Sequence, residues 1–514
     1  MKITMPNMEL GSFWFWSSVC LLAVTTTTLL IQIKRVHSRR LPPGPRGWPL
    51  LGNIFDLAGN LPPHETLARL GQKYGPVMWL RLGAVNTLVI SSTSAAEEFF
   101  KKHDLSFAGR SINEAMKSHA YNEGSLAIAQ YGPRWRMLRR LCVSALIAVK
   151  QLNETVCVRR KCVDELLGWI AEEAERGPTG YIEISPYVFM MIFNMMGNLV
   201  LSRDLVDPKS KVGTEFYLSM QKLMHWSGLP NVADFFPSLR CLDPQGIRGN
   251  MDRDLGRAFE IIKGFIEERM QGRCLDDQTN GKKDFLDVVL EFEGDEEKPG
   301  KMSDRDLKVF ILEMFLAASD TTNTTTEWAM TELLHNPKTM CQAQAELIEV
   351  VGLGRKVEES DIDKLRYLKA VVKETMRLHP PIPLLVPRRA VEDVKFMGYQ
   401  IPKDTQVFVH AWAIGRDSAY WDEPLTFKPE RFLNVDLDYF GQHLQFIPFG
   451  AGRRMCAGIQ LAERVLILVL GSLIHSFDWS IDGTPEDMDM RERIGITLRK
   501  AVPLKAKPVP RRTM

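Results

Sequence analysis

Phe449-Gly450-Ala451-Gly452-Arg453-Arg454-Met455-Cys456-Ala457-Gly458, near the C-terminal end of the 514-residue chain, decides the fold. It ends a glycine-rich loop with one cysteine, and a long apolar run beginning at Ile459 follows. A thiolate stays ionised only beside donors or dipoles, and a cysteine that opens a helix faces the N–H groups of its first turn. The glycines permit sharp turns and a close approach to a flat ligand, and Arg454 offers a planar cation for a carboxylate. These parts predict Cys456 as a thiolate ligand of haem iron, with Arg454 on a haem propionate.

Five positions of this loop, Phe449, Gly452, Arg454, Cys456 and Gly458, match the pattern Phe-x-x-Gly-x-Arg-x-Cys-x-Gly. The pattern resembles the cysteine-ligand loop of the cytochrome P-450 haem-thiolate monooxygenases. The resemblance implies heme b as the cofactor, held through its iron by the cysteine, and an NADPH- and O₂-dependent oxidoreductase. The competing interpretation is a buried structural cysteine after a glycine-rich turn, which is the usual fate of a lone cysteine.

Composition sets broad limits. The length allows one large, internally layered domain or two, and the 45% apolar and 25% charged content is ordinary for a globular protein. A net charge of +2 gives no field to attract nucleic acid, so no nucleic-acid partner is expected. The eight cysteines are scattered without paired spacing, which favours a reducing compartment and argues against zinc.

The N-terminus carries a candidate membrane anchor. Ser12 to Ile33 contains no charged residue, and as a helix it would be roughly 33 Å long, enough to span a bilayer. Basic residues follow at once, which places the rest of the chain in the cytosol. We therefore expect a single-pass protein of the endoplasmic reticulum membrane, in contact with the lipid bilayer. Its segments are a lumenal N-terminus (1–11), a transmembrane signal-anchor helix (12–33), a basic and proline-rich hinge (34–47) and a haem-thiolate catalytic domain (48–514).

Most of the remaining sequence is typical of helices, with short β-rich runs at Val77–Leu82, Thr87–Ser91 and Val394–Gln400. The pattern is therefore mainly α, of the α+β type, and the resemblance makes it the triangular cytochrome P-450 haem-thiolate fold with a small β-rich lobe. One helix candidate begins behind the cap Ser303 and contains no Pro or Gly before Pro337, so that it would be roughly 48 Å long. The charged segment from 274 to 302 is expected to be an exposed connection.

Ala317-Ala318-Ser319-Asp320-Thr321-Thr322 lies within this long helix. The resemblance makes Asp320 and Thr321 the catalytic pair: an acid and an alcohol that relay protons for oxygen activation. A threonine inside a helix can also bond the carbonyl four residues back, here that of Ala317, and bend the helix. Ala318 departs from the family pattern, in which glycine is usual, and its methyl group could narrow the oxygen-binding groove. The alternative is a polar stripe on an ordinary helix.

Three further residues form a structural expectation. Glu374 and Arg377 lie three apart in a candidate helix, and Arg431 follows in Pro429-Glu430-Arg431-Phe432. By resemblance these three form a buried charge cluster that locks the haem-side core, whereas in isolation Glu-x-x-Arg is usually a solvated pair.

The resemblance also assigns donors to the haem propionates: Trp135, Arg139 and Arg388, together with Arg454. The alternative for Trp135 is an ordinary core tryptophan. Further basic residues could form a docking face for an acidic reductase surface, namely Arg134, Arg136, Arg140 and Arg453. The chain contains no flavin or dinucleotide motif, so we expect its electrons to come from NADPH through a separate cytochrome reductase.

The candidate substrate pocket is apolar and predicts a small lipophilic substrate. The resemblance places these residues in it: Phe315, Ala317, Ala318, Leu384, Leu385 and Ile496. The chain is most similar to plant enzymes of specialised metabolism in the group of geraniol hydroxylases and iridoid oxidases, which favours a monoterpenoid or iridoid. The alternatives are a flavonoid or alkaloid hydroxylase, a haem-thiolate isomerase or dehydratase that uses no O₂, and a non-catalytic haem sensor.

Overall fold

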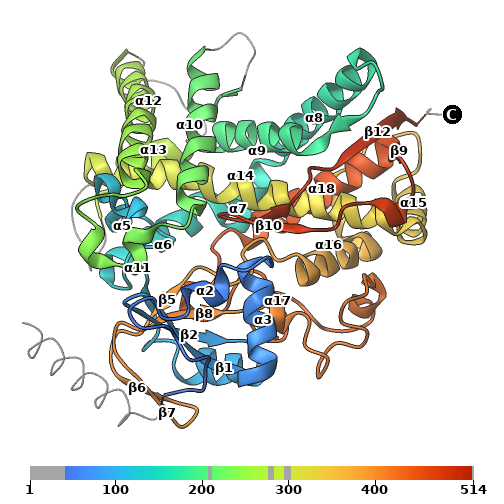
Figure 1. Cartoon of the computed structure of the whole chain (residues 1–514). Helices are drawn as coiled ribbons and strands as arrows, with labels where there is room; N and C mark the ends of the chain where they lie inside the picture. Colours follow the sequence, from blue (N-terminus) through green and yellow to red (C-terminus); the bar gives the residue numbers. More distant parts are fainter. Residues whose placement is uncertain (1–40, 207–210, 276–282, 295–301, 512–514) are drawn as a thin grey trace, which may run out of the picture.

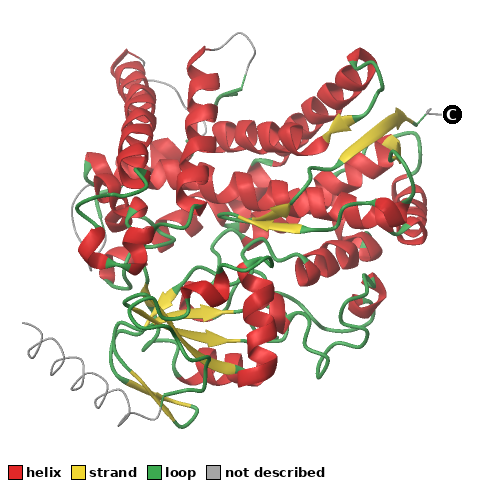
Figure 2. Ribbon diagram, viewed as in Figure 1, coloured by secondary structure: helices red, strands yellow, loops and turns green. Residues whose placement is uncertain are grey.

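The computed structural model describes residues 41–206, 211–275, 283–294 and 302–511. Within these ranges the chain forms a large helical lobe and a smaller lobe built on a sheet (Figures 1 and 2). This matches the predicted mainly α fold with a small β-rich lobe. The expected lumenal segment 1–11, the anchor helix 12–33 and the first part of the hinge lie outside the described residues.

The small lobe contains a five-stranded sheet in the order β1-β2-β8-β5-β3. Strands β2 and β8 are parallel, and the other neighbours are antiparallel. Both faces of β2 are apolar near its end, with Leu88, Val89 and Ile90 almost fully buried. The strands are β1 Val77–Leu82, β2 Val85–Ile90, β3 Gly109–Arg110, β5 Arg388–Arg389 and β8 Gln406–Val409, and the flanking short helices are α2 Ile54–Leu57, α3 Pro63–Tyr74, α4 Thr93–Glu97 and α17 Ala411–Ile414.

The proline-rich part of the hinge, from residue 41 onward, is attached to this sheet. The Trp79 amide of β1 donates a hydrogen bond to the Pro43 carbonyl over 2.8 Å. A Cβ atom at Gly44 would lie 1.9 Å from the Trp79 carbonyl oxygen, so only glycine fits there. The second half of the hinge is therefore part of the small lobe.

The helical lobe is organised around α14, Asp304–His335, which crosses it (yellow in Figure 1). Its 32 residues and its cap, Ser303 accepting a hydrogen bond from the Asp306 amide over 3.1 Å, confirm the helix expected from the sequence. Helices α9, α12, α16 and α18 pack on it. The bounds of the other helices of this lobe are α5 Tyr121–Gly124, α6 Pro133–Cys142, α7 Val149–Glu154, α8 Val156–Arg176, α9 Ile184–Leu201, α10 Lys211–Gly228, α11 Val232–Phe235, α12 Ile247–Leu275, α13 Phe285–Glu291, α15 Pro337–Val351, α16 Arg366–Leu378 and α18 Ile459–Ser476.

Three small antiparallel arrangements complete the fold. The strands are β6 Val394–Phe396 with β7 Tyr399–Ile401, β10 Glu492–Ile494 with β11 Leu498–Lys500, and β12 Lys505–Pro510 between β4 Ile182–Glu183 and β9 Phe477–Ser480. The run 394–400, expected as one strand, is thus a hairpin that turns at Met397 and Gly398, where φ is positive. The connection 274–302 also contains an unexpected helix, α13, which begins at an Asp284–Asp287 capping box.

Helices α9 and α18 are long and apolar enough to cross a membrane, but each is 72% buried inside the fold. Their apolar residues belong to the main hydrophobic core, with α9 against α14 and α18 against α8 and α14. In the described part of the chain, the apolar residues of α9 and α18 therefore form part of the hydrophobic core.

Candidate functional site

The loop before Cys456 needs glycine at two positions. Gly450 and Gly452 have φ values of 73° and 67°, in the left-handed region. A Cβ atom at Gly452 would also lie 2.5 Å from a carboxylate oxygen of Asp104. Gly458 has an ordinary φ of −87°, so its backbone does not require glycine. A Cβ atom at this position would lie 3.9 Å from the Cys456 sulfur, and glycine leaves that space open. The Cys456 amide donates to the Phe449 carbonyl over 3.0 Å and closes the loop.

The Cys456 thiol stands just before α18, as the sequence indicates. The residue is accessible in the chain alone, although protein lies close around it. Burial raises the pKa of the Cys456 thiol, while the Gly458 N–H and the Arg139 guanidinium act in the opposite direction. One backbone donor and one nearby positive charge, at a sulfur that is otherwise costly to ionise, fit a thiolate that bonds a metal cation, because the cation completes the stabilisation.

Arginines crowd the same region. Arg110, Arg388 and Arg454 are 5%, 5% and 7% exposed. Burial, followed by repulsion from Arg388 and Arg139, lowers the pKa of Arg454 to about 9. Burial and neighbouring arginines also lower the pKa of Arg110, and burial lowers that of Arg388.

The anions that face these arginines within the described residues are too few. Asp104 pairs with Arg388 over 3.2 Å and with Arg453 over 2.9 Å. Among the residues that the structure describes, Arg454 donates only to the carbonyls of Ala108 and Ala129, and its buried Nη1 has no partner. An anionic cofactor would neutralise these buried arginines and would give the unpaired Arg454 donor an acceptor. The residues present therefore fit the two propionates of a haem.

Two other expected cofactor residues are oriented by the protein itself. The indole N–H of Trp135 donates to the Leu126 carbonyl over 2.8 Å, and its ring stacks 4.3 Å from the Arg454 guanidinium carbon. Arg139 donates to the Met455 carbonyl over 2.7 Å. In this structure Trp135 thus orients Arg454, and Arg139 braces the residue next to Cys456.

The middle of α14 presents one polar site. The Thr321 hydroxyl donates to the Ala317 carbonyl over 2.8 Å, which is the bond expected from the sequence. Ala317 is exposed although its helix crosses the core, whereas Asp320 is only 1% exposed. Both Asp320 oxygens are held, one by the Thr497 hydroxyl over 2.6 Å and the other by the Arg499 guanidinium.

The proposed pocket residues do not all lie together. The Phe315 ring is fully buried and packs 5.2 Å from the rings of Phe193 and Phe216, in the core between α9, α10 and α14. About 200° of helix rotation separates it from Ala317, so the two residues cannot share a face. We therefore assign Phe315 to the core; the sequence pattern alone did not fix the helix rotation.

The other pocket candidates remain partly accessible. Leu385 has a left-handed φ of 51°, and its side chain lies 3.7 Å from the position of a Cβ at Gly450, beside the cysteine loop. Leu384 packs instead with the apolar cluster under β1. Ile496 stands at the tip of the β10–β11 hairpin, and Ala318 is partly buried on α14.

The Glu374 cluster is assembled as the sequence indicates. Glu374 accepts two hydrogen bonds of 2.7 Å from Arg377, one of 3.0 Å from Arg431 and one of 2.8 Å from the Lys428 amide. The side chains of Glu374 and Arg377 are fully buried. Arg377 also donates to three backbone carbonyls, of Gly415, Pro424 and Thr426. The cluster therefore ties α16 to the loop that leads toward Cys456.

Comparison with known proteins agrees with this geometry. The cytochrome P450 family pattern matches residues 42–507. The chain belongs to the cytochrome P450 family. It is 47% identical to cytochrome P450 76A2 of Solanum melongena over 97% of this chain and 98% of that protein. It is also 47% identical to an iridoid oxidase of Catharanthus roseus, over 93% and 94%, and 41% identical to a geraniol 8-hydroxylase of the same plant, over 92% and 94%. A zebrafish cytochrome P450 with progesterone has the same fold, with a TM-score of 0.74, 26% identity and coverage of 88% of this chain and 100% of the other.

Membership makes this protein a haem-thiolate monooxygenase that receives its electrons from a reductase and acts on a lipophilic substrate. When bound, the haem supplies the oxidising chemistry. The chain's own residues supply a sulfur donor, buried cations for the propionates, and a threonine next to a held carboxylate. Of the expected docking arginines, Arg134 is paired with Asp306 and Arg453 with Asp104.

Sequence reasoning missed a regular feature of this P450. Acids stand every seven residues along α14, at Asp306, Glu313, Asp320 and Glu327. Seven residues return a helix to nearly the same face, two turns and about 10.5 Å further on. Each acid holds a different segment: Arg134 of α6, the 125–127 loop, the β10–β11 hairpin, and the Leu504 amide over 3.0 Å. The seven-residue spacing of these acids was the signal in the sequence that could have revealed them.

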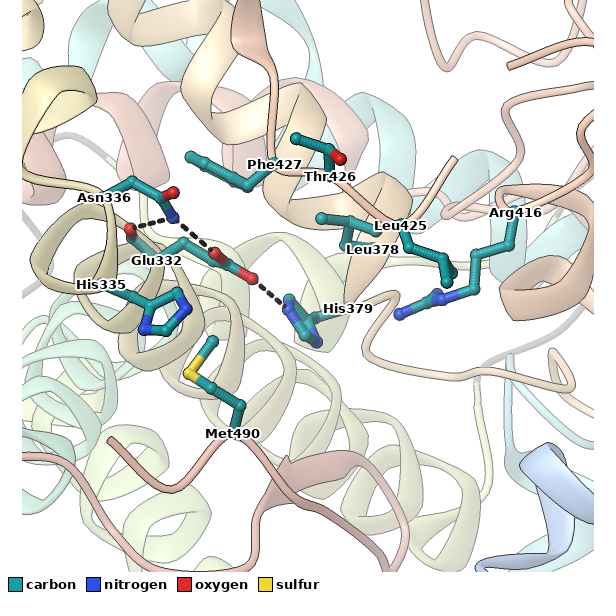
Figure 3. A pocket seen from close by; sticks show the side chains of 10 residues that line it. All are labelled: Glu332, His335, Asn336, Leu378, His379, Arg416, Leu425, Thr426, Phe427 and Met490. Atoms are coloured by element: carbon teal, nitrogen blue, oxygen red, sulfur yellow. Dashed lines mark hydrogen bonds and ion pairs between the residues drawn. The ribbon is translucent and has the colours of Figure 1, made fainter. Parts of the chain in front are cut away.

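A second missed feature is a histidine cluster, defined as His64, Glu332, His379, Trp412 and Glu492. The His379 nitrogens lie 2.7 Å from Glu332 and 2.7 Å from Glu492, and Glu492 also accepts from His64 over 2.8 Å and Trp412 over 3.0 Å. Figure 3 shows Glu332 directed at His379 in a pocket of about 400 Å³. Charged and polar residues line this pocket together with Leu378, Leu425, Phe427 and Met490. Neither Cys456 nor Thr321 lines it, so it is not the oxidation site.

Proposed function

We propose that this P450 inserts one oxygen atom from O₂ into a monoterpenoid or iridoid. The observation that supports the substrate class is the 47% identity to an iridoid oxidase over nearly the whole chain, together with the 41–42% identity to geraniol 8-hydroxylases. The accessible candidates Ala317, Leu385 and Ile496 are apolar, as a small terpenoid substrate requires.

Each site residue has a proposed role in this function. Cys456 ligates the haem iron, Arg388 and Arg454 neutralise the propionates, and Asp320 and Thr321 carry protons from solvent to the oxygen that is reduced. Removing a proton-transfer group of this kind costs roughly 10²–10⁴-fold in rate. The Thr321 hydroxyl donates its hydrogen to the Ala317 carbonyl, so its lone pairs remain available to accept a hydrogen bond from a donor.

We further propose that residues 12–33 anchor the protein in the endoplasmic reticulum membrane by a single span. Residues 34–47 are then the basic and proline-rich hinge, whose second half is bound to the small lobe, and residues 48–514 are the catalytic domain on the cytosolic side. The uncharged run followed by basic residues supports this orientation. NADPH-cytochrome reductase is the proposed electron donor.

A carbon-monoxide difference spectrum of the reduced protein tests the thiolate. Wild-type protein is expected to show the strongly red-shifted Soret band of a thiolate-bound haem, and Cys456→Ser is expected to abolish it. A folded protein that binds haem and keeps this band after Cys456→Ser would contradict the assignment.

The substrate class is tested by titrating the oxidised protein with geraniol, an iridoid alcohol, a flavanone and an alkaloid. We expect a low-to-high-spin shift of the Soret band with the first two, and a hydroxylated product when reductase and NADPH are added. Spin shifts and products with the flavanone or the alkaloid alone would assign the enzyme to the other substrate class. Product formation without O₂ would contradict the monooxygenase activity.

A further inference from the structure

We propose that Thr497 and Arg499, carried by the β10–β11 hairpin, are positioning residues that hold the Asp320 carboxylate for proton delivery. The proposal rests on the proposed function of Asp320. Thr497 donates to Oδ2 of Asp320 over 2.6 Å, and Arg499 donates to Oδ1. The two donors occupy both carboxylate oxygens and hold the Asp320 side chain in one orientation.

The hairpin is fixed along α14 over three successive turns. Thr497 contacts the Thr324 hydroxyl over 3.3 Å, one turn after Asp320. The Trp328 indole, one turn further, donates to the Leu498 carbonyl over 2.9 Å. Residues 320, 324 and 328 share one helix face, so the strand lies along that face as a rigid support for the acid.

The base of the hairpin is also held. Glu492 at the start of β10 is bound by His379, the residue that follows α16, and His379 in turn contacts Glu332 of α14 (Figure 3 shows the His379–Glu332 contact). Glu492 is surrounded by His379, His64, Trp412 and Arg416. Burial raises the pKa of its carboxyl, but the hydrogen bonds of His379 and His64 outweigh burial, so the pKa is lowered overall. The acid at position 320 is therefore supported through the hairpin by the histidine cluster.

The tip of the hairpin meets the end of α10. A Cβ atom at Gly228 would lie 2.6 Å from the Ile496 amide and 2.9 Å from the Gly495 carbonyl carbon. Ile496 is also a candidate substrate contact. The hairpin thus carries, within four residues, an apolar side chain for the substrate and the two donors that orient Asp320.

Arg499 links the buried acid to solvent. Its side chain is 38% exposed, whereas that of Asp320 is 2% exposed. Productive turnover is RH + O₂ + NADPH + H⁺ → ROH + H₂O + NADP⁺, and every proton must reach the site from water. If the acid is misplaced, the same electrons leave as hydrogen peroxide: O₂ + NADPH + H⁺ → H₂O₂ + NADP⁺. A positioning role for Thr497 and Arg499 therefore predicts uncoupling.

The test compares product, NADPH and hydrogen peroxide for the full-length holoenzyme with reductase. For Arg499→Leu and Thr497→Val we expect the ratio of product to peroxide to fall roughly tenfold, with a larger solvent deuterium isotope effect on product formation. Arg499→Lys should recover most of the coupling, since it keeps a cation beside Asp320. The Soret spin shift with substrate and the carbon-monoxide band should stay at wild-type values, because neither residue is proposed to bind haem.

Arg491→Leu is the matched control: this arginine stands at the base of the same hairpin with a side chain 78% exposed, and pairs with Asp489. Wild-type coupling in both Arg499→Leu and Thr497→Val, with native spectra, would overturn the proposal. Wild-type coupling in Asp320→Asn would instead overturn the proposed function of the acid. If Arg499→Leu loses haem, Thr497→Val, which removes the hydroxyl contacts with Asp320 and Thr324 and keeps the side-chain shape, decides alone.

Discussion

Replacing Glu374 by glutamine should destabilise the whole protein although the side chain keeps its size. The carboxylate is fully buried and receives four hydrogen bonds, three of them from Arg377 and Arg431. Glutamine leaves these guanidinium groups without their counter-charge in a site closed to water. Breaking one side of a buried ion pair costs about 3–5 kcal/mol, a large share of the roughly 5–15 kcal/mol that holds a typical domain folded.

The size of the chain determines how this loss is observed. With an unfolding entropy of about 2.1 cal/mol/K per residue, a protein of this length loses only about 1 °C of Tm per kcal/mol. We therefore expect a Tm about 3–5 °C lower, together with a smaller haem-bound fraction in the carbon-monoxide spectrum. The control is Glu172→Gln, which breaks an i,i+4 pair with Arg176 whose side chains are 61% and 73% exposed. Such surface pairs contribute about 0–1 kcal/mol, so a Glu374→Gln protein no less stable than this control would refute the reasoning.

Three more predictions follow from other contacts. Arg454→Leu removes a buried donor from the arginine group and should weaken haem retention, measured by haem transfer to apomyoglobin, while Arg140→Leu, on the exposed side of the same region, should not. Burial alone would lower the pKa of His379, but hydrogen bonds to Glu332 and Glu492 raise it. Its stabilisation is complete below the unfolded value of about 6.5 and is lost as pH rises through the folded pKa. Urea midpoints of wild type should thus fall with rising pH relative to His379→Gln; parallel curves would contradict this. Gly44→Val should lower Tm by displacing the Pro43–Trp79 contact, whereas Gly59→Val, with open space around it, should have little effect.

Local patterns in the sequence predicted those parts of the fold that local physics controls. Helix α14 was predicted with its bounds, because a Ser cap, an uninterrupted helical run and a terminal proline are adjacent in the sequence. The same reasoning predicted the Thr321–Ala317 bond, four residues apart on one helix. It joined β6 and β7 into one strand, because the left-handed turn at Met397 carries little turn signal beyond Gly398.

The site was predictable only where a motif names the residue. Cys456, Arg454 and the Glu374 cluster were found through their motifs, whereas Asp104, Arg110, Thr497 and Arg499 were not. Each of the four makes a contact with a segment 177 to 349 residues away, and no periodicity links such positions. The rotation of Phe315 into the core had the same cause, because the aromatic rings that pack against it come from α9 and α10.

The four acids on α14 are equally spaced along one helix face, and four separate segments of the chain bind them at that spacing. A point substitution at one acid removes one of these contacts and leaves the other three in place. One inserted or deleted residue between Asp306 and Glu327 would turn everything beyond it by about 100° and slide it about 1.5 Å, disengaging every later partner together. Relatives of this enzyme should therefore differ hardly at all in the length of this helix.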